Sequence, residues 1–228
     1  RVVLLRVAAN TVAAAYNEAA ERAHGSILCF LSGATRIVSP DWLREMVSHA
    51  IRPGIGPVGA LILTPDNKVR HAGIVLGIHG RIGYAYRMSD SGGIGHLMRL
   101  RVIQNISAVS AACMAIRRDI FREASGFDAV NFPDYYDDVD LCLRLAEHGL
   151  RTVWTPYAKV CQWDRMGRAE EFDKNCTDGP ELENLRKRWG QLLTSDPYYN
   201  ANLTLERDDS ALASPPRYLQ PWRIHQVN

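Results

Sequence analysis

Three carboxylates crowd the start of one strongly periodic segment, and they are the best candidates for chemistry in this sequence. Asp137, Asp138 and Asp140 stand where apolar side chains begin to recur at helical spacing, and Gly149 provides a stop, so we expect a helix from 138 to about 148. The free N–H groups and the dipole at a helix N-terminus favour an ionised carboxylate there. Asp138 is therefore either a general base or only the helix N-cap, and the residues alone leave both interpretations open.

The elements that must position these carboxylates alternate between strands and helices. Apolar β-branched runs predict strands at 2–7, 27–31, 58–63, 73–78, 82–86, 102–116, 152–154 and 158–162. Helical patterns with start or stop signals predict helices at 11–24, 39–51, 117–124, 138–148 and 180–194. The sequence thus predicts an α/β domain over 1–205, followed by an extended, proline-containing tail over 206–228.

The composition excludes several classes of function. Lysine and arginine number 27 against 25 acidic residues, and a net charge of +2 is too small for a nucleic-acid footprint. None of the five cysteines lies in a C-x-x-C pair, which indicates reduced thiols rather than a zinc or redox site. No apolar run approaches the ~20 residues that a membrane helix needs. We expect a cytoplasmic protein and leave peripheral association with the inner membrane face open.

Five segments, taken in order, resemble the family 2 glycosyltransferases. They are Asn17 with Gly25 and FLSGAT (30–35), SGFD (125–128), YYDDVDLCLRLAEHGL (135–150), TPYAKV (155–160) and DPYYNANL (196–203). Together they are similar to the bacterial branch that builds cell-surface polysaccharide, including rhamnosyltransferase-like enzymes. The resemblance implies a GT-A-like fold, a mixed sheet flanked by helices. It also implies an amino-terminal truncation, because the family's P-x-Y-N strand and base-binding acidic residue would precede Arg1.

The resemblance assigns roles to the acidic cluster. Asp138 matches the second acid of the family's glutamate-aspartate motif, which implies that it is the base of an inverting sugar transfer. Asp137 is then acceptor-facing or a partner of Asp138, and Asp128 contacts acceptor or donor sugar. Tyr136 either stacks on an acceptor ring or belongs to the core.

The metal site of the family is absent from the aligned positions. Its DxD motif falls on Ser32, Gly33 and Ala34, and its metal-binding histidine falls on Gln162. Family members would use Mn²⁺ or Mg²⁺, but hydroxyl, backbone and amide groups are poor substitutes for carboxylates around a hard dication. We therefore predict no metal cofactor, with Arg165, Arg168 or Arg36 as replacement cations for the leaving diphosphate.

Two functions follow from the resemblance. The first is an inverting glycosyltransferase that moves a sugar from a nucleotide donor to a glycan or lipid-linked acceptor. The second is a non-catalytic glycosyltransferase-like module that binds a glycan or a protein partner. The retained Asp138 favours the first, and the replacement of the metal motif at 32–34 favours the second.

Overall fold

The computed structural model describes residues 4, 6–163, 179–207 and 210–217. The α-helices are α1 (Val12–Arg22), α2 (Trp42–Ala50), α3 (Arg118–Glu123), α4 (Asp137–Glu147) and α6 (Pro180–Thr194). The strands are β1 (Ile27–Leu31), β2 (Thr35–Ile37), β3 (Ile55–Leu63), β4 (Val69–His71), β5 (Ile74–Leu76), β6 (Ile82–Tyr84), β7 (Gln104–Ile106), β8 (Cys113–Arg117) and β9 (Arg151–Gln162). Two short 3₁₀ helices, η1 (Ile78–Gly80) and η2 (His96–Arg101), complete the elements.

The centre of the molecule is a seven-stranded sheet in the order β1-β8-β3-β9-β2, with β4 paired to β3 and β7 paired to β9. The β3–β9 pair is parallel, and the other pairs of this sheet are antiparallel. Strands β5 and β6 form a separate hairpin. This is the mixed sheet with flanking helices that the family resemblance implies.

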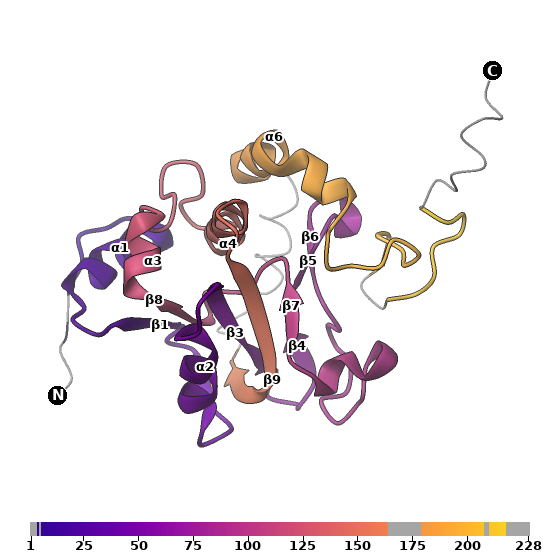
Figure 1. Ribbon diagram of the computed structural model, residues 1–228, viewed down its shortest axis with the longest axis horizontal. Coiled ribbons are helices and arrows are strands. Elements are labelled where there is room, and N and C mark those ends of the chain that lie inside the picture. The colour runs from indigo at the N-terminus through magenta and orange to yellow at the C-terminus, as the bar shows by residue number, and fades with distance from the viewer. Residues whose placement is uncertain (1–3, 5, 164–178, 208–209, 218–228) are drawn as a thin grey trace.

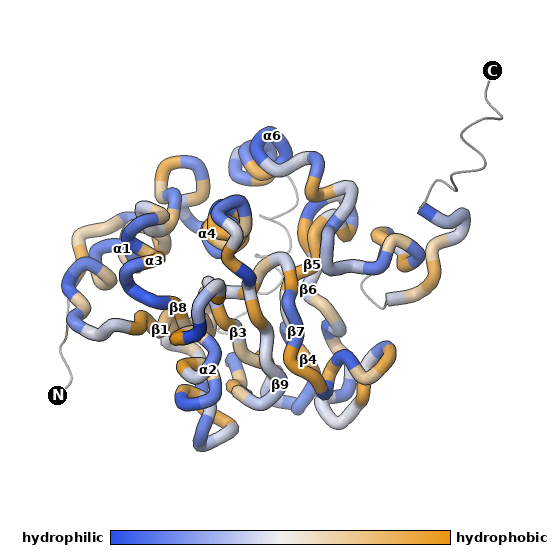
Figure 2. The backbone as a smooth tube through the Cα atoms, viewed as in Figure 1, coloured by the Kyte–Doolittle hydropathy of each residue, from blue (hydrophilic) through white to orange (hydrophobic). Residues whose placement is uncertain are grey.

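Alternation of side chains along the central strands divides the core between the two faces of the sheet. On β8, Cys113 and Ala115 face a cluster built with Met46 of α2, whereas Met114 and Ile116 face a larger cluster that draws on α1, α3, α4 and α6. In Figure 1, α4 and α6 accordingly lie above the sheet and α2 lies below it. Figure 2 shows apolar residues gathered on the strands and hydrophilic residues along the outer side of α6.

Several expected elements differ from the structure. The run 102–116 contains two strands, β7 and β8, because the backbone turns between them, and the two strands expected at 152–162 are one continuous β9. The short strands β2 and β4 lack an apolar pattern and were not expected. The predicted strand at 2–7 is not observed at its described residues, Leu4, Arg6 and Val7.

The predicted tail is described in part. The N–H of Thr204 donates to the carbonyl of Ala211 at 2.8 Å, and the N–H of Ala213 donates to the carbonyl of Asn202 at 2.7 Å. Arg217 donates from Nε to the carbonyl of Leu203 at 2.7 Å. The described part of the tail therefore folds back on residues 202–204 instead of extending away. None of the described helices combines the length and apolar character that a membrane crossing needs.

Candidate active site

A cavity of about 300 Å³ opens on the face of the sheet that α4 covers. Residues from the start of the chain, the sheet and the N-terminus of α4 meet around it. They include six predicted site residues: Ser32, Ala34, Tyr136, Asp137, Asp138 and, at the end of β9, Gln162. The 32–35 turn and the acidic cluster thus line one cavity.

Helix α4 begins one residue earlier than predicted, and Asp138 is not its cap. The N-cap is Tyr136, whose backbone is left-handed (φ 63°) and whose side chain makes no capping hydrogen bond. This conformation is uncommon for a bulky residue and places Asp137 and Asp138 in the first turn. The Tyr136 side chain is itself buried at the cavity wall.

Backbone donors hold the Asp138 carboxylate in place. Oδ2 accepts the N–H of Ala111 at 2.9 Å, and Oδ1 accepts the N–H of Val139 at 2.8 Å. No ion pair joins Asp138 to any residue in the part of the chain that the structure describes. The carboxylate is therefore fixed in orientation but not neutralised by a cation.

Burial changes the electrostatics that the helix terminus alone predicts. Desolvation raises the pKa of Asp138 above its usual value, although hydrogen bonds from Ala111, Val139 and Ser110 act in the opposite direction. Asp137 is 6% exposed, and desolvation followed by the charge of Asp138 raises its pKa well above the usual value. Burial and then the same two carboxylates also raise the pKa of Tyr16, which lines the cavity. Desolvation outweighs the local donors, so the pKa of Asp138 shifts upward and not in the direction that the helix N-terminus alone favours.

The pairing of β2 with β9 assembles the positions where a metal site was expected. Thr35 pairs with Gln162, and the N–H of Trp163 donates to the carbonyl of Ala34 at 2.9 Å. Ser32 and Ala34 therefore share the cavity wall with Gln162, and Gly33 lies in the turn between them. A hydroxyl, a methyl group and an amide do not fit a hard dication. Among the described residues, no group of three or more His, Cys, Asp or Glu side chains is arranged to hold a metal ion.

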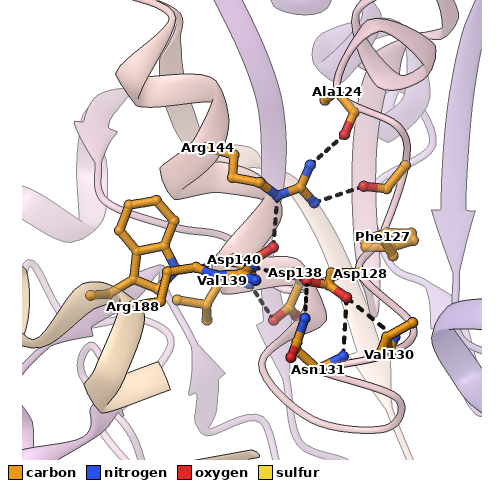
Figure 3. A network of polar contacts seen from close by, with 12 residues as sticks. Ala124, Phe127, Asp128, Val130, Asn131, Asp138, Val139, Asp140, Arg144 and Arg188 are labelled. Atoms are coloured by element: carbon orange, nitrogen blue, oxygen red, sulfur yellow. Dashed lines mark hydrogen bonds and ion pairs between the residues drawn. The ribbon is translucent and has the colours of Figure 1, made fainter. Parts of the chain in front are cut away.

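The structure places Asp128 outside this cavity, in a polar network between α4 and α6 (Figure 3). Its carboxylate accepts hydrogen bonds from Asn131 Nδ2 at 2.8 Å and from Arg188 at 2.9 Å. Desolvation disfavours the ionised form of Asp128. The hydrogen bonds from Asn131, Arg188 and Val130 outweigh it and lower the pKa of Asp128 to about 2. Arg188 bridges Asp128 and the buried Asp140.

The predicted replacement cations are not part of the described cavity wall. Arg165 and Arg168 lie outside the described residues, and Arg36 is exposed on β2. Arg70 of β4 is the one basic side chain among the described lining residues. Neither Arg70 nor its neighbour His71, which also lines the cavity, belongs to a motif or spacing that predicts a site.

Other residues that contribute to the family resemblance have structural roles. The Asn17 side chain donates to the carbonyl of Phe127 at 2.8 Å and accepts its N–H at 2.9 Å. This clamp fixes the turn at Gly126, where φ is +69° and an added Cβ would lie 2.5 Å from the Asn17 oxygen. Phe127 is buried against Tyr16 and Phe30. The turn thus supports the cavity wall through Tyr16.

Comparisons with known proteins agree with this architecture. The sequence is 35% identical over 204 residues to the O-antigen biosynthesis protein RfbC of Myxococcus xanthus, covering 88% of this chain and 16% of that protein. It is 29% identical over 129 residues to an N-acetylglucosaminyl-diphospho-decaprenol L-rhamnosyltransferase of Mycobacterium tuberculosis, covering 53% of this chain and 42% of that protein. The chain therefore spans less than half the length of these relatives.

A solved structure and a family model give the fold and the family. The structure of GalNAc-T7 with UDP, GalNAc and Mn²⁺ superposes with a TM-score of 0.54 at 15% identity, over 68% of this chain and 31% of that one. Such a likeness supports the GT-A fold and nothing finer. The model of the glycosyltransferase-like family 2 matches residues 1–190. The chain belongs to glycosyltransferase family 2.

Proposed function

We propose that this chain carries the catalytic centre of an inverting glycosyltransferase that moves a sugar from a nucleotide donor to a glycan or lipid-linked acceptor. The observation that carries the proposal is the position of Asp138, a carboxylate without a cationic partner among the described residues, in one cavity with Ser32, Ala34 and Gln162. The names of two relatives, one for O-antigen biosynthesis and one for transfer of rhamnose to a lipid-linked sugar, support a role in surface polysaccharide synthesis.

The chemistry requires one proton acceptor on the acceptor side. Asp138 takes the proton of the acceptor hydroxyl, the oxygen attacks the anomeric carbon, and the bond to the nucleoside diphosphate breaks on the opposite face. A carboxylate whose pKa is raised by desolvation is a stronger base than one in water. The backbone donors at Ala111 and Val139 keep its orientation fixed.

The substitution Asp138→Asn tests this assignment in the full-length protein. The amide keeps the shape but cannot accept the proton, so turnover should fall by the ~10²–10⁴ typical of removing a general base, with donor affinity little changed. Asp119→Asn is the matched control, because Asp119 is an exposed carboxylate on α3. Parental turnover in Asp138→Asn would contradict the assignment of Asp138 as the general base.

We also propose that the transfer needs no divalent cation at residues 32–34 and 162. Arg70 is the cation in the described wall that can offset the charge of the leaving diphosphate. Transfer should therefore persist in EDTA, whereas Arg70→Gln should lower kcat/KM and the exposed control Arg36→Gln should not. Activity that depends on added Mn²⁺ or Mg²⁺ would contradict this part.

A second function, a non-catalytic glycosyltransferase-like module, is favoured by the replaced metal motif. It predicts that the full-length protein neither transfers nor hydrolyses sugar from any of the common nucleotide donors, while a glycan or a protein still binds. The same donor screen that measures Asp138→Asn distinguishes the two functions.

A further inference from the structure

Strand β4 carries an irregularity beside the cavity. Ile62 of β3 pairs with His71, but the next residue, Leu63, pairs with Val69, so Arg70 is an extra residue on β4. Such a β-bulge breaks the alternation of side chains and re-aims them. It explains how two consecutive residues, Arg70 and His71, both line one cavity.

The tautomer of His71 is fixed by its neighbour in the chain. The N–H of Gly73 donates to Nδ1 at 3.2 Å, so Nδ1 is the acceptor and Nε2 carries the proton of the neutral ring. The residue is 3% exposed, and Nε2 has no hydrogen-bond partner among the residues that the structure describes. Desolvation, with the nearby charge of Arg70 in support, lowers the pKa of His71 to about 3, so the ring stays neutral at physiological pH.

A second unsatisfied polar atom belongs to the same cavity wall. Oδ2 of Asp137 is buried and has no hydrogen-bond partner in the described part of the chain, and Asp137 lines the cavity with His71. Buried polar groups are nearly always satisfied, and leaving one unpaired costs free energy. Two such groups at one cavity indicate a ligand that supplies the missing partners.

We propose that His71 is a sugar-binding residue of this cavity, and that its Nε2–H donates a hydrogen bond to a hydroxyl oxygen of the bound saccharide. The proposal rests on the proposed function, since it assigns a ligand contact within that site. The neutral His71 ring carries no positive charge of its own, so its Nε2–H suits a hydroxyl oxygen, whereas Arg70 in the same wall is the group that suits a phosphate. The Asp137 carboxyl can bond to a further hydroxyl of the saccharide.

Aromatic and apolar groups next to His71 suit the same ligand. The ring of Tyr84 lies 4.9 Å from the His71 ring, centroid to centroid, and Tyr84, Ile82 and Tyr16 line the cavity. Pockets that bind small molecules combine an apolar wall with a few placed polar groups. The apolar carbon face of a pyranose can pack on that wall while its hydroxyls meet the polar atoms.

The test measures binding of simple saccharides rather than activity. Methyl glycosides of rhamnose, mannose, galactose, glucose and N-acetylglucosamine are titrated by NMR into the full-length protein and into His71→Leu. The loss of one buried hydrogen bond should weaken the bound glycoside by about 3- to 10-fold. His71→Gln, whose amide N–H can replace Nε2–H, should recover part of that affinity.

Deoxy analogues separate a direct contact from a change in packing or a displaced water. The analogue that lacks the contacted hydroxyl should bind the parent more weakly than the full glycoside does, but His71→Leu should bind the two equally. The matched control is His49→Leu, because His49 is also buried, at 8% exposure, but contacts Glu45 on α2 away from the cavity. Thermal unfolding of all variants shows that each is folded.

Three results would overturn the proposal: parental affinity of His71→Leu for every glycoside, an equal penalty for the deoxy analogue in parent and His71→Leu, or no binding of any glycoside by the parent. The outcome is independent of catalysis. If His71-dependent binding is present without transfer, the glycosyltransferase proposal fails and this one stands. If Asp138-dependent transfer occurs and KM is unchanged in His71→Leu, the glycosyltransferase proposal stands and the sugar-binding role of His71 fails.

Discussion

Two groups of carboxylates on the first turn of α4 have opposite environments. Asp140 is fully buried and is paired with Arg144 Nε at 2.7 Å, with Arg188 at 2.7 Å and with the indole N–H of Trp189 at 3.0 Å. Asp137 and Asp138 face the cavity and have no cationic partner among the described residues. Residues two apart on a helix lie on nearly opposite sides, which separates Asp138 from Asp140.

The difference in partners indicates that Asp140 stabilises the fold and that Asp138 is available for chemistry. A buried charge with two guanidinium partners anchors α6 to α4, and removing a partner leaves that charge uncompensated. A desolvated carboxylate held only by N–H and O–H donors keeps a raised pKa and an accessible lone pair. Local sequence is almost the same at the two sites, so the packing partners alone create the contrast.

The largest effect expected from the contrast between Asp138 and Asp140 is the pH dependence of transfer. Since the pKa of Asp138 is raised, kcat/KM should fall on the acid side, about tenfold per pH unit, with a midpoint above the ordinary aspartate value of 3.8. Asp137 and Asp138 interact, so the midpoint belongs to the pair. The acid limb should vanish from the residual activity of Asp138→Asn, and a midpoint below 3.8 in the folded enzyme would contradict the assignment.

A smaller effect is expected on the paired side. Arg144→Met removes the Nε contact to Asp140 and the contacts to the carbonyls of Ala124 and Gly126. The free energy of unfolding should fall by about 3 kcal/mol, at the low end for a broken buried ion pair because Arg188 remains. Urea denaturation measures it, with Arg122→Met as the control, since the Arg122–Glu21 pair is exposed and its loss should change little. An equal loss in the free energy of unfolding in Arg144→Met and Arg122→Met would contradict the stabilising role of the Asp140 pair.

The smallest expected effect is a gain in stability, in contrast to the loss expected for Arg144→Met. The folded-state pKa of Asp137 lies above its unfolded value, so the stability linked to this group is fully present below the unfolded pKa and is lost as pH rises through the folded one. Asp137→Asn should therefore raise the Tm at pH 7.5, and the gain should shrink toward pH 4. Calorimetry at the two pH values checks it; a lower Tm at pH 7.5 would show that the Asp137 charge is compensated.

The sequence by itself determined the elements with a strong local period. The apolar spacing in 138–148 placed α4 within one residue, the run 27–31 matched β1, and Pro180 with the following pattern matched α6. The motifs also located the acidic cluster at the start of α4. These features depend on neighbours a few residues away, which is the range over which helix and strand preferences act.

Only the tertiary structure decided how these residues are used. Arg188 reaches Asp140 across 48 positions, Asn17 clamps Phe127 across 110, and Thr35 meets Gln162 through the register of β2 and β9. The bulge that brings Arg70 and His71 to the cavity is a property of the β3–β4 pairing. The residue types near it do not predict a site. Burial, which raises the pKa of Asp138, likewise comes from distant segments that exclude water, so no local pattern can encode it.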